Sequence, residues 1–143
     1  MRPLQPGDAA PPIPGAEPTD VPGAVVFYKV TCPTCQMAAP AMERLSAVGE
    51  HRFVAVAQDP PDSAEEFARR YGLSFRSVPD TAPFELSNAY GIRTVPTAFV
   101  VEGGAITDVV ESWDREGWNR AARGLGLDAV SHEGDGLPPF RPG

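Results

Sequence analysis

The sequence is poor in the residues that build metal sites and disulfide scaffolds. It contains only two cysteines and two histidines among 143 residues. A small fold stapled by several disulfides is therefore excluded, because it needs more cysteines than this chain has. Basic residues are also scarce: the chain has 12 Lys and Arg against 19 Asp and Glu, which gives a net charge of −7. Because binding to phosphates needs clustered cations, we do not expect nucleic acid as a partner.

Long apolar runs are missing as well. No stretch approaches the roughly 18–20 apolar residues of a membrane-spanning helix, so no membrane span is expected. Residues 1–8 contain no apolar core of the kind that a signal peptide needs, and we therefore expect a cytoplasmic protein. The length of 143 residues suits one domain with its own core.

Proline is abundant and unevenly placed, and it divides the chain. Residues 1–23 hold seven of the 17 prolines, which predicts a Pro-rich N-terminal arm that is extended along the surface or mobile. Residues 24–127 carry the periodic apolar patterns of a folded domain. From residue 128 onwards glycine, proline and charged residues dominate, so residues 128–143 are predicted to be a flexible C-terminal tail.

The most informative stretch lies between residues 24 and 49. The apolar run 24–30 predicts a buried strand, and residues 33–48 predict a helix that Gly49 ends. Cys32 and Cys35 are therefore placed at a strand-to-helix junction. The free N–H groups and the dipole of a helix N-terminus favour a thiolate there, and Pro33 is tolerated in a first turn. This arrangement is typical of a redox dithiol.

The remaining patterns alternate strands with helices. The stretch Asp62-Ser63-Ala64-Glu65 resembles a capping box at the start of a helix that Gly72 ends. Trp113 and Trp118 are spaced for a hydrophobic staple around Asp114, the expected cap of a last helix. The other predicted elements are a strand at 53–57, a short strand or connector at 73–78, a short helix at 83–90, and strands at 97–101 and 105–110 joined by a tight turn at Gly103-Gly104. This order predicts an α/β fold with a mixed sheet between helices.

Two blocks of residues together resemble the thioredoxin-like superfamily. Residues 32–40, Cys-Pro-Thr-Cys-Gln-Met-Ala-Ala-Pro, are similar to its active site and kinked first helix. Residues 90–97, Tyr-Gly-Ile-Arg-Thr-Val-Pro-Thr, are similar to the segment that carries its cis-proline. Residues 6–11 resemble the start of the TlpA-like and redoxin branch. The resemblance implies a three-layer α/β/α sandwich with a mixed central sheet.

The position of each thiol and the resemblance assign roles to individual residues. Cys32 at the junction is the expected nucleophile, and Cys35, one turn deeper, is the expected resolving thiol. The resemblance implies that Pro96 is cis and that the backbone of Val95 pairs with an extended substrate chain. The expected site-shaping residues around the dithiol are Thr31, Pro33, Thr34 and Lys29, the last either adding positive charge or being an ordinary solvated lysine.

The chain also departs from the family pattern. Val26 and Ala38 stand where relatives place an acidic residue that handles the proton of the second cysteine, so the sequence does not identify that proton acceptor. Thr31 stands where Trp is usual. Lys29 and Val25 replace the Thr and Pro of the motif that activates a peroxidatic cysteine.

The leading hypothesis is a thiol–disulfide oxidoreductase. It would act as a monomer on protein disulfides or dithiols with an unidentified electron donor, and its only redox group would be the Cys32–Cys35 disulfide, with no cofactor and no metal. A peroxiredoxin-like antioxidant and a non-catalytic redox sensor or binding module are also compatible with the sequence. Two lesser alternatives are that the cysteines are inert core thiols, against which the junction position and Pro33 argue, or half of a zinc site, for which only His51 and His132 remain as nitrogen ligands.

Overall fold

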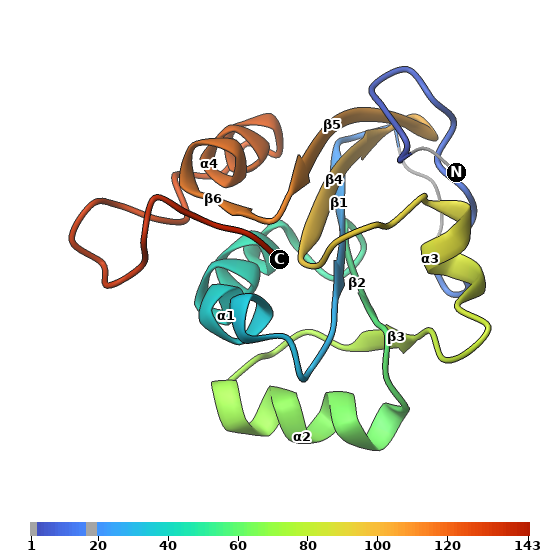
Figure 1. Ribbon diagram of the computed structural model, residues 1–143. Helices are drawn as coiled ribbons and strands as arrows, with labels where there is room; N and C mark the ends of the chain where they lie inside the picture. The colour runs from blue at the N-terminus through green and yellow to red at the C-terminus, as the bar shows by residue number, and fades with distance from the viewer. Residues whose placement is uncertain (1–2, 17–19) are drawn as a thin grey trace.

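A five-stranded sheet forms the centre of the protein in a computed structural model, which describes residues 3–16 and 20–143 (Figure 1). The strand order is β3-β2-β1-β4-β5. The strands are β1 (Gly23–Tyr28), β2 (Phe53–Ala57), β3 (Ser77–Pro79), β4 (Thr97–Glu102) and β5 (Ala105–Glu111). The first three run parallel, whereas β4 and β5 pair antiparallel, so the predicted mixed sheet is confirmed.

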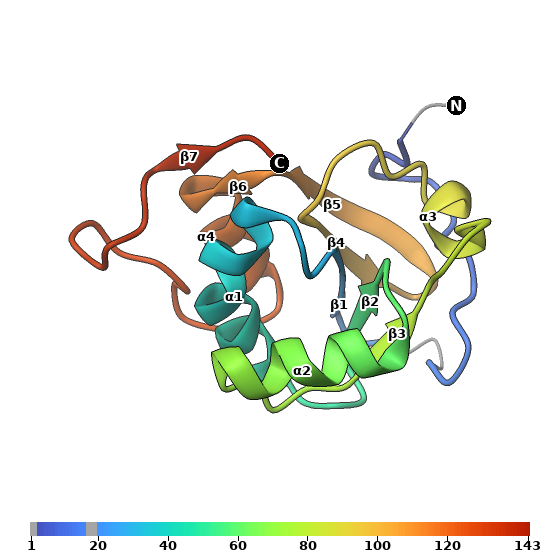
Figure 2. The same cartoon turned by 60° about the horizontal axis from the view of Figure 1, so that its bottom comes forward.

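Helices cover both faces of this sheet (Figures 1 and 2). They are α1 (Pro33–Leu45), continued by the 3-10 helix η1 (Ser46–Val48), then α2 (Pro61–Tyr71), α3 (Glu85–Ala89) and α4 (Arg115–Gly124). Helices α1, α2 and α4 contribute side chains to one apolar cluster, and α3 lies on the opposite face with the N-terminal arm. This is the three-layer arrangement that the sequence predicts. None of the helices in the described ranges is long and apolar enough to span a membrane.

Strand β1 contributes side chains to the apolar clusters on both faces of the sheet. Successive side chains of a strand point to opposite faces, so its residues divide between the two apolar clusters. Val26 and Tyr28 pack towards α1 and α4, whereas Val25 and Phe27 pack towards α3. All four are buried, because β1 lies between β2 and β4 with both faces covered. This position explains why the run shows no alternation of apolar and polar residues.

The described part of the N-terminal arm packs against the edge of the sheet. Gly7 donates its N–H to the carbonyl of Ile106 at 2.9 Å, and Ala10 donates to that of Gly104 at 2.8 Å. The hydroxyl of Tyr90 donates to the carbonyl of Pro11 at 2.7 Å. Residues 1–2 and 17–19 of the predicted arm lie outside the described residues.

The predicted capping box at 62–65 is wrong. Helix α2 begins at Pro61, and its N-cap is Pro60 in place of Asp62, with no side-chain cap hydrogen bond. The two prolines explain the difference: Pro61 holds the dihedral angle that a first helical residue needs, and it keeps Pro60 extended. At α4, Asp114 is the N-cap but its side chain makes no cap hydrogen bond.

The C-terminal residues 128–143 are held by hydrogen bonds, where the sequence predicts a flexible tail. The two-residue strand β7 (Phe140–Arg141) pairs with β6 (Trp113–Asp114), and the indole N–H of Trp113 donates to the carbonyl of Pro138 at 2.7 Å. Asn119 of α4 accepts the N–H of Val130 at 2.9 Å. Many of these partners are backbone groups of the tail, which its composition does not reveal.

Candidate active site

The two cysteines lie where β1 passes into α1. Cys32 is the N-cap of α1 in an extended conformation, and Pro33 occupies the first turn. The N–H of Cys35 donates to the Sγ of Cys32 at 3.3 Å, so one of the free N–H groups of the helix end points at this sulfur. Cys32 is half-buried, Cys35 is completely buried, and both are free thiols. Of the two thiols, only that of Cys32 is therefore accessible to solvent.

Burial raises the pKa of the Cys35 thiol. Removal from water is the largest cause, because a buried anion loses its hydration. A hydrogen bond from the Lys29 backbone acts in the opposite direction, and the neighbouring Cys32 and Asp59 raise the pKa further. Cys35 consequently keeps its proton at neutral pH. The difference in environment supports Cys32 as nucleophile and Cys35 as resolving thiol.

The loop before β4 forms the second side of the site. The Val95–Pro96 peptide bond is cis, as is Ala82–Pro83. The carbonyl of Val95 accepts a hydrogen bond from the Cys32 thiol at 3.5 Å, across 63 positions of sequence. Pro96 itself is fully buried. The fold thus brings together the two blocks that the sequence singles out.

The four predicted site-shaping residues have different surroundings. Thr31 and Pro33 are exposed on either side of Cys32. The contact of Lys29 with the site is through its backbone, because its carbonyl accepts the N–H of Cys32 at 3.1 Å. Thr34 is only 3% exposed, and its hydroxyl donates to the carbonyl of Pro142 at 2.6 Å.

Asp59 is a site residue that the sequence alone did not single out. It follows β2, is 8% exposed and accepts the N–H of Val30 at 2.9 Å. Burial raises the pKa of Tyr28, and the charge of Asp59 raises it further. A signal for Asp59 was available, because β1 and β2 are parallel and the residues that follow them meet at one edge of the sheet.

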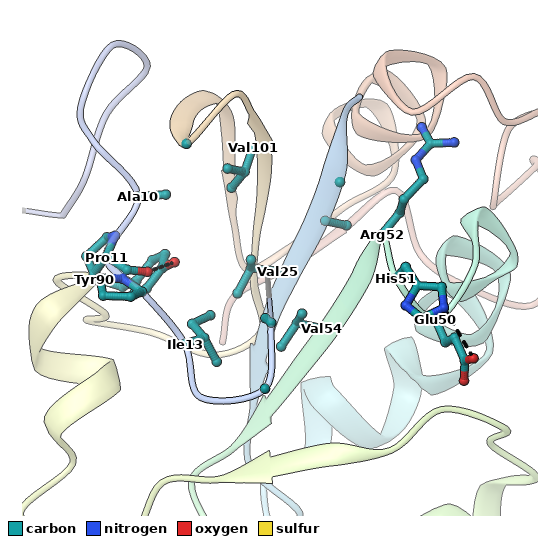
Figure 3. A pocket seen from close by; sticks show the side chains of 16 residues that line it. Ala10, Pro11, Ile13, Val25, Glu50, His51, Arg52, Val54, Tyr90 and Val101 are labelled. Carbon is teal, nitrogen blue, oxygen red and sulfur yellow. Dashed lines mark hydrogen bonds and ion pairs between the residues drawn. The ribbon is translucent and has the colours of Figure 1, made fainter. Parts of the chain in front are cut away.

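A cavity of about 340 Å³ lies at the other end of β1, beneath the N-terminal arm (Figure 3). Ile13 and Tyr90 line one side, and Val25 and Val54 form its floor on the sheet. His51 at its rim pairs with Glu50 at 3.7 Å and is 91% exposed. Within residues 3–16 and 20–143, no group of three or more His, Cys, Asp and Glu side chains could hold a metal ion.

Comparison with known proteins identifies a family and several similar proteins. The family model described as AhpC/TSA matches residues 17–109. The thiol-disulfide oxidoreductase ResA of Halalkalibacterium halodurans is 38% identical over 90 residues, which cover 58% of this chain and 49% of the relative. ResA of Geobacillus thermodenitrificans is 31% identical over 80 residues, covering 53% and 45%. The chain thus spans about half the length of these relatives.

Solved structures show the same fold. A structure described as a thiol:disulfide interchange protein DsbE from Chlorobium tepidum superposes with a TM-score of 0.70 at 21% identity, covering 90% of this chain and 99% of its own. MTB DsbF, in mixed oxidized and reduced forms, gives a TM-score of 0.61 at 26% identity, covering 79% and 83%. The fold is therefore thioredoxin-like, and the match of the family model over most of the domain shows that this chain belongs to the AhpC/TSA family.

Proposed function

We propose that this protein is a thiol–disulfide oxidoreductase whose Cys32 and Cys35 alternate between dithiol and disulfide. The observation that carries the proposal is the pair itself: a half-buried Cys32 at the start of α1 and a buried Cys35 one turn below it. The ResA relatives are named for this activity, which supports the proposal for the part of the chain that they match. The dithiol supplies the redox chemistry without a bound cofactor.

The first step is attack of the Cys32 thiolate on a substrate disulfide. A bond forms between the Sγ of Cys32 and one substrate sulfur, and the other substrate sulfur leaves as a thiolate. The N–H of Cys35, 3.3 Å from the Sγ of Cys32, stabilises the attacking anion. The thiol of Cys35 stays protonated during this step because burial raises its pKa.

The second step closes the intramolecular disulfide. Cys35 gives its proton to the substrate thiolate released in the first step and attacks the Sγ of Cys32, which breaks the mixed disulfide and releases the second substrate sulfur as a thiolate. The substrate has gained two electrons, and the Cys32–Cys35 pair has lost two. We propose protein disulfides as substrates, since the backbone of Val95 beside Cys32 offers a carbonyl on which an extended chain can pair. In the opposite direction the same steps oxidise a substrate dithiol.

Catalysed reduction of insulin disulfides by dithiothreitol tests this proposal. We expect the wild-type protein to accelerate the reaction, and Cys32→Ser to reduce it to the uncatalysed rate. Glu66→Gln, on the exposed side of α2, is the control variant and should retain the wild-type rate. If the wild-type protein catalyses neither reduction of insulin nor oxidation of a reduced protein, the proposal is wrong.

Peroxide reduction is a second candidate, which the match to the AhpC/TSA family model favours. Lys29 and Val25 occupy the positions of the Thr and Pro that activate a peroxidatic cysteine. We therefore expect hydrogen peroxide to oxidise Cys32 no faster than an ordinary thiol. Stopped-flow measurement of peroxide consumption checks this, and a rapid phase that requires Cys32 would establish the second candidate instead.

A further inference from the structure

The last residues of the chain, 138–143, cross the molecule to the dithiol, and we refer to them as the C-terminal strap. Trp113 donates its indole N–H to Pro138, and Arg115 donates its N–H to the carbonyl of Pro139 at 3.0 Å. Strand β7 of the strap pairs with β6. In Figures 1 and 2 the red end of the chain lies beside the starts of α1 and β4. The path of the strap therefore leads from α4 to the active site.

At its far end the strap contacts the neighbours of Cys32. The hydroxyl of Thr34 donates to the carbonyl of Pro142 at 2.6 Å, and Gly143 donates its N–H to the hydroxyl of Ser112 at 3.1 Å. Gly143 lies so close to the cis-proline loop that a Cβ added there would overlap the carbonyl oxygen of Val95. That oxygen is also the acceptor of the Cys32 thiol. The strap therefore lies against the same carbonyl group that accepts the Cys32 thiol.

The strap lies against Thr34 and Val95, the neighbours of Cys32, and leaves Cys32 itself partly accessible on its open side. Thr34, which lies between the two cysteines in sequence, is only 3% exposed beneath the strap. Thr31 and Pro33 are exposed, and Cys32 remains partly accessible. A compact molecule can approach the Sγ of Cys32 from the open side. A polypeptide that pairs along Val95 needs the position that Gly143 occupies.

The strap is attached by polar contacts and buries little of its own surface. Phe140 is 56% exposed, and the other strap residues from 139 to 143 are also exposed. The ladder between β6 and β7 joins two strands of two residues each, and such short ribbons are marginally stable in water. Segments with few buried apolar contacts open at low free-energy cost. The strap can therefore leave the site while the rest of the domain stays folded.

We propose that the C-terminal strap is a specificity element of the active site, an inference that rests on the proposed exchange function. With the strap in place, Cys32 reacts with small disulfides from its open side. A polypeptide disulfide reacts only when residues 142–143 have moved away from Thr34 and Val95. The strap thus lowers the activity on protein disulfides relative to that on small disulfides.

The ratio of two activities tests this inference. We compare kcat/KM for insulin with kcat/KM for 2-hydroxyethyl disulfide, because a change in the reactivity of the dithiol alters both and leaves their ratio unchanged. Thr34→Val removes the hydroxyl that donates to Pro142, and Thr34→Ser keeps it. Gly143→Ala forces a Cβ against Val95, whereas Gly124→Ala adds one in open space.

We expect the insulin to 2-hydroxyethyl disulfide ratio to rise about fivefold in Thr34→Val, the size of effect that loss of one hydrogen bond produces. Gly143→Ala should raise the ratio as well, while Thr34→Ser and Gly124→Ala leave it at the wild-type value. An unchanged ratio in both Thr34→Val and Gly143→Ala, with active wild-type protein, overturns the inference and leaves the proposed function standing. A wild-type protein that turns over neither substrate overturns the proposed function itself.

Discussion

The two sulfur atoms of the site differ in environment although they are one helical turn apart. Cys32 lies at the N-cap, where its sulfur accepts an N–H, and Cys35 is completely buried. Burial opposes ionisation of Cys35, so the two thiols differ in solvent access, and the roles that we propose for them rest on this difference. The carboxylate of Asp59 adds to this asymmetry, because its negative charge further disfavours a thiolate at Cys35.

Replacement of Asp59 tests this electrostatic contribution. In Asp59→Asn we expect the pKa of Cys35 to fall, because a negative charge that raises it is removed while an oxygen remains to accept the N–H of Val30. The rate at which Cys35 resolves the mixed disulfide, followed against pH, measures the change, because that step needs the Cys35 thiolate. Glu65→Gln on the exposed side of α2 is the matched control and should leave this pH profile unchanged. An equal or higher pKa in Asp59→Asn contradicts the assignment.

Individual site residues could be predicted where the signal is local. The C-x-x-C spacing and Pro33 are contiguous, and the second block around Pro96 carries its own pattern. Thr34 was singled out for its place between the cysteines, but its hydrogen bond to Pro142 spans 108 positions and has no local signature. The effect of Asp59 on Cys35 likewise depends on the pairing of β1 with β2.

At the scale of elements, helix α4 packs closely on β5 through a glycine. A Cβ on Gly117 would lie 2.6 Å from Cγ1 of Val110 and 3.2 Å from Oδ2 of Asp114. Trp118, the next residue, is completely buried against Trp113 with ring centroids 5.3 Å apart. The helix therefore cannot move away from the strand to admit a side chain without disturbing this aromatic pair.

Two glycine substitutions in α4 measure that close approach. Gly117→Ala should lower the free energy of unfolding by about 1–3 kcal/mol, because the added methyl group overpacks the contact with Val110. Gly124→Ala in the same helix meets no atom within 4 Å, and we expect it to be neutral or to stabilise by up to about 1 kcal/mol. Urea denaturation gives both values, and equal effects of the two substitutions would contradict the packing.

The turn before the strap depends on the charge of Asp135. Hydrogen bonds from the Ser131 hydroxyl and the Leu137 N–H lower the pKa of this carboxyl from 3.8 to about 2. Since the folded pKa lies below the unfolded one, the stabilisation is complete above about pH 4 and is lost as the pH falls towards 2.

Acid titration of the turn checks this dependence. We expect the amide of Leu137 to lose protection from hydrogen exchange between about pH 4 and 2 in the wild-type protein. In Asp135→Asn this loss should be absent, because the replacement amide does not titrate. The same midpoint in both proteins would show that another group controls the turn.

The predicted helices and strands match the structure where glycines in the sequence mark a turn or a helix end. The turn at Gly103-Gly104 needs positive φ at both residues, and both have it, so the β4–β5 hairpin followed from the sequence. The start of α2 differs from the predicted capping box, because the dihedral limits of Pro60 and Pro61 outweigh that pattern. The defined structure of the C-terminal residues could not be predicted, because it depends on backbone carbonyls that accept hydrogen bonds from side chains distant in sequence.

For the whole molecule, the two ends of β1 carry different features. The dithiol, Asp59 and the Val95 loop meet at the carboxyl end of the parallel strands, and the cavity beneath the arm lies at the other end. The N-terminal arm stabilises the edge of the sheet through Gly7 and Ala10, whereas the C-terminal strap reaches the site. The described part of the N-terminal arm and the C-terminal strap thus contact different parts of the same domain (Figure 1).

The central claim is that Cys32 forms the bond to substrate and that Cys35 resolves it. Trapping of a mixed disulfide tests this claim most directly. When Cys35→Ser is mixed with insulin, mass spectrometry should find a stable adduct joined through Cys32, and Cys32→Ser should give none because Cys35 is buried. The absence of an adduct in Cys35→Ser, or an equal adduct on Cys35 in Cys32→Ser, would contradict the account.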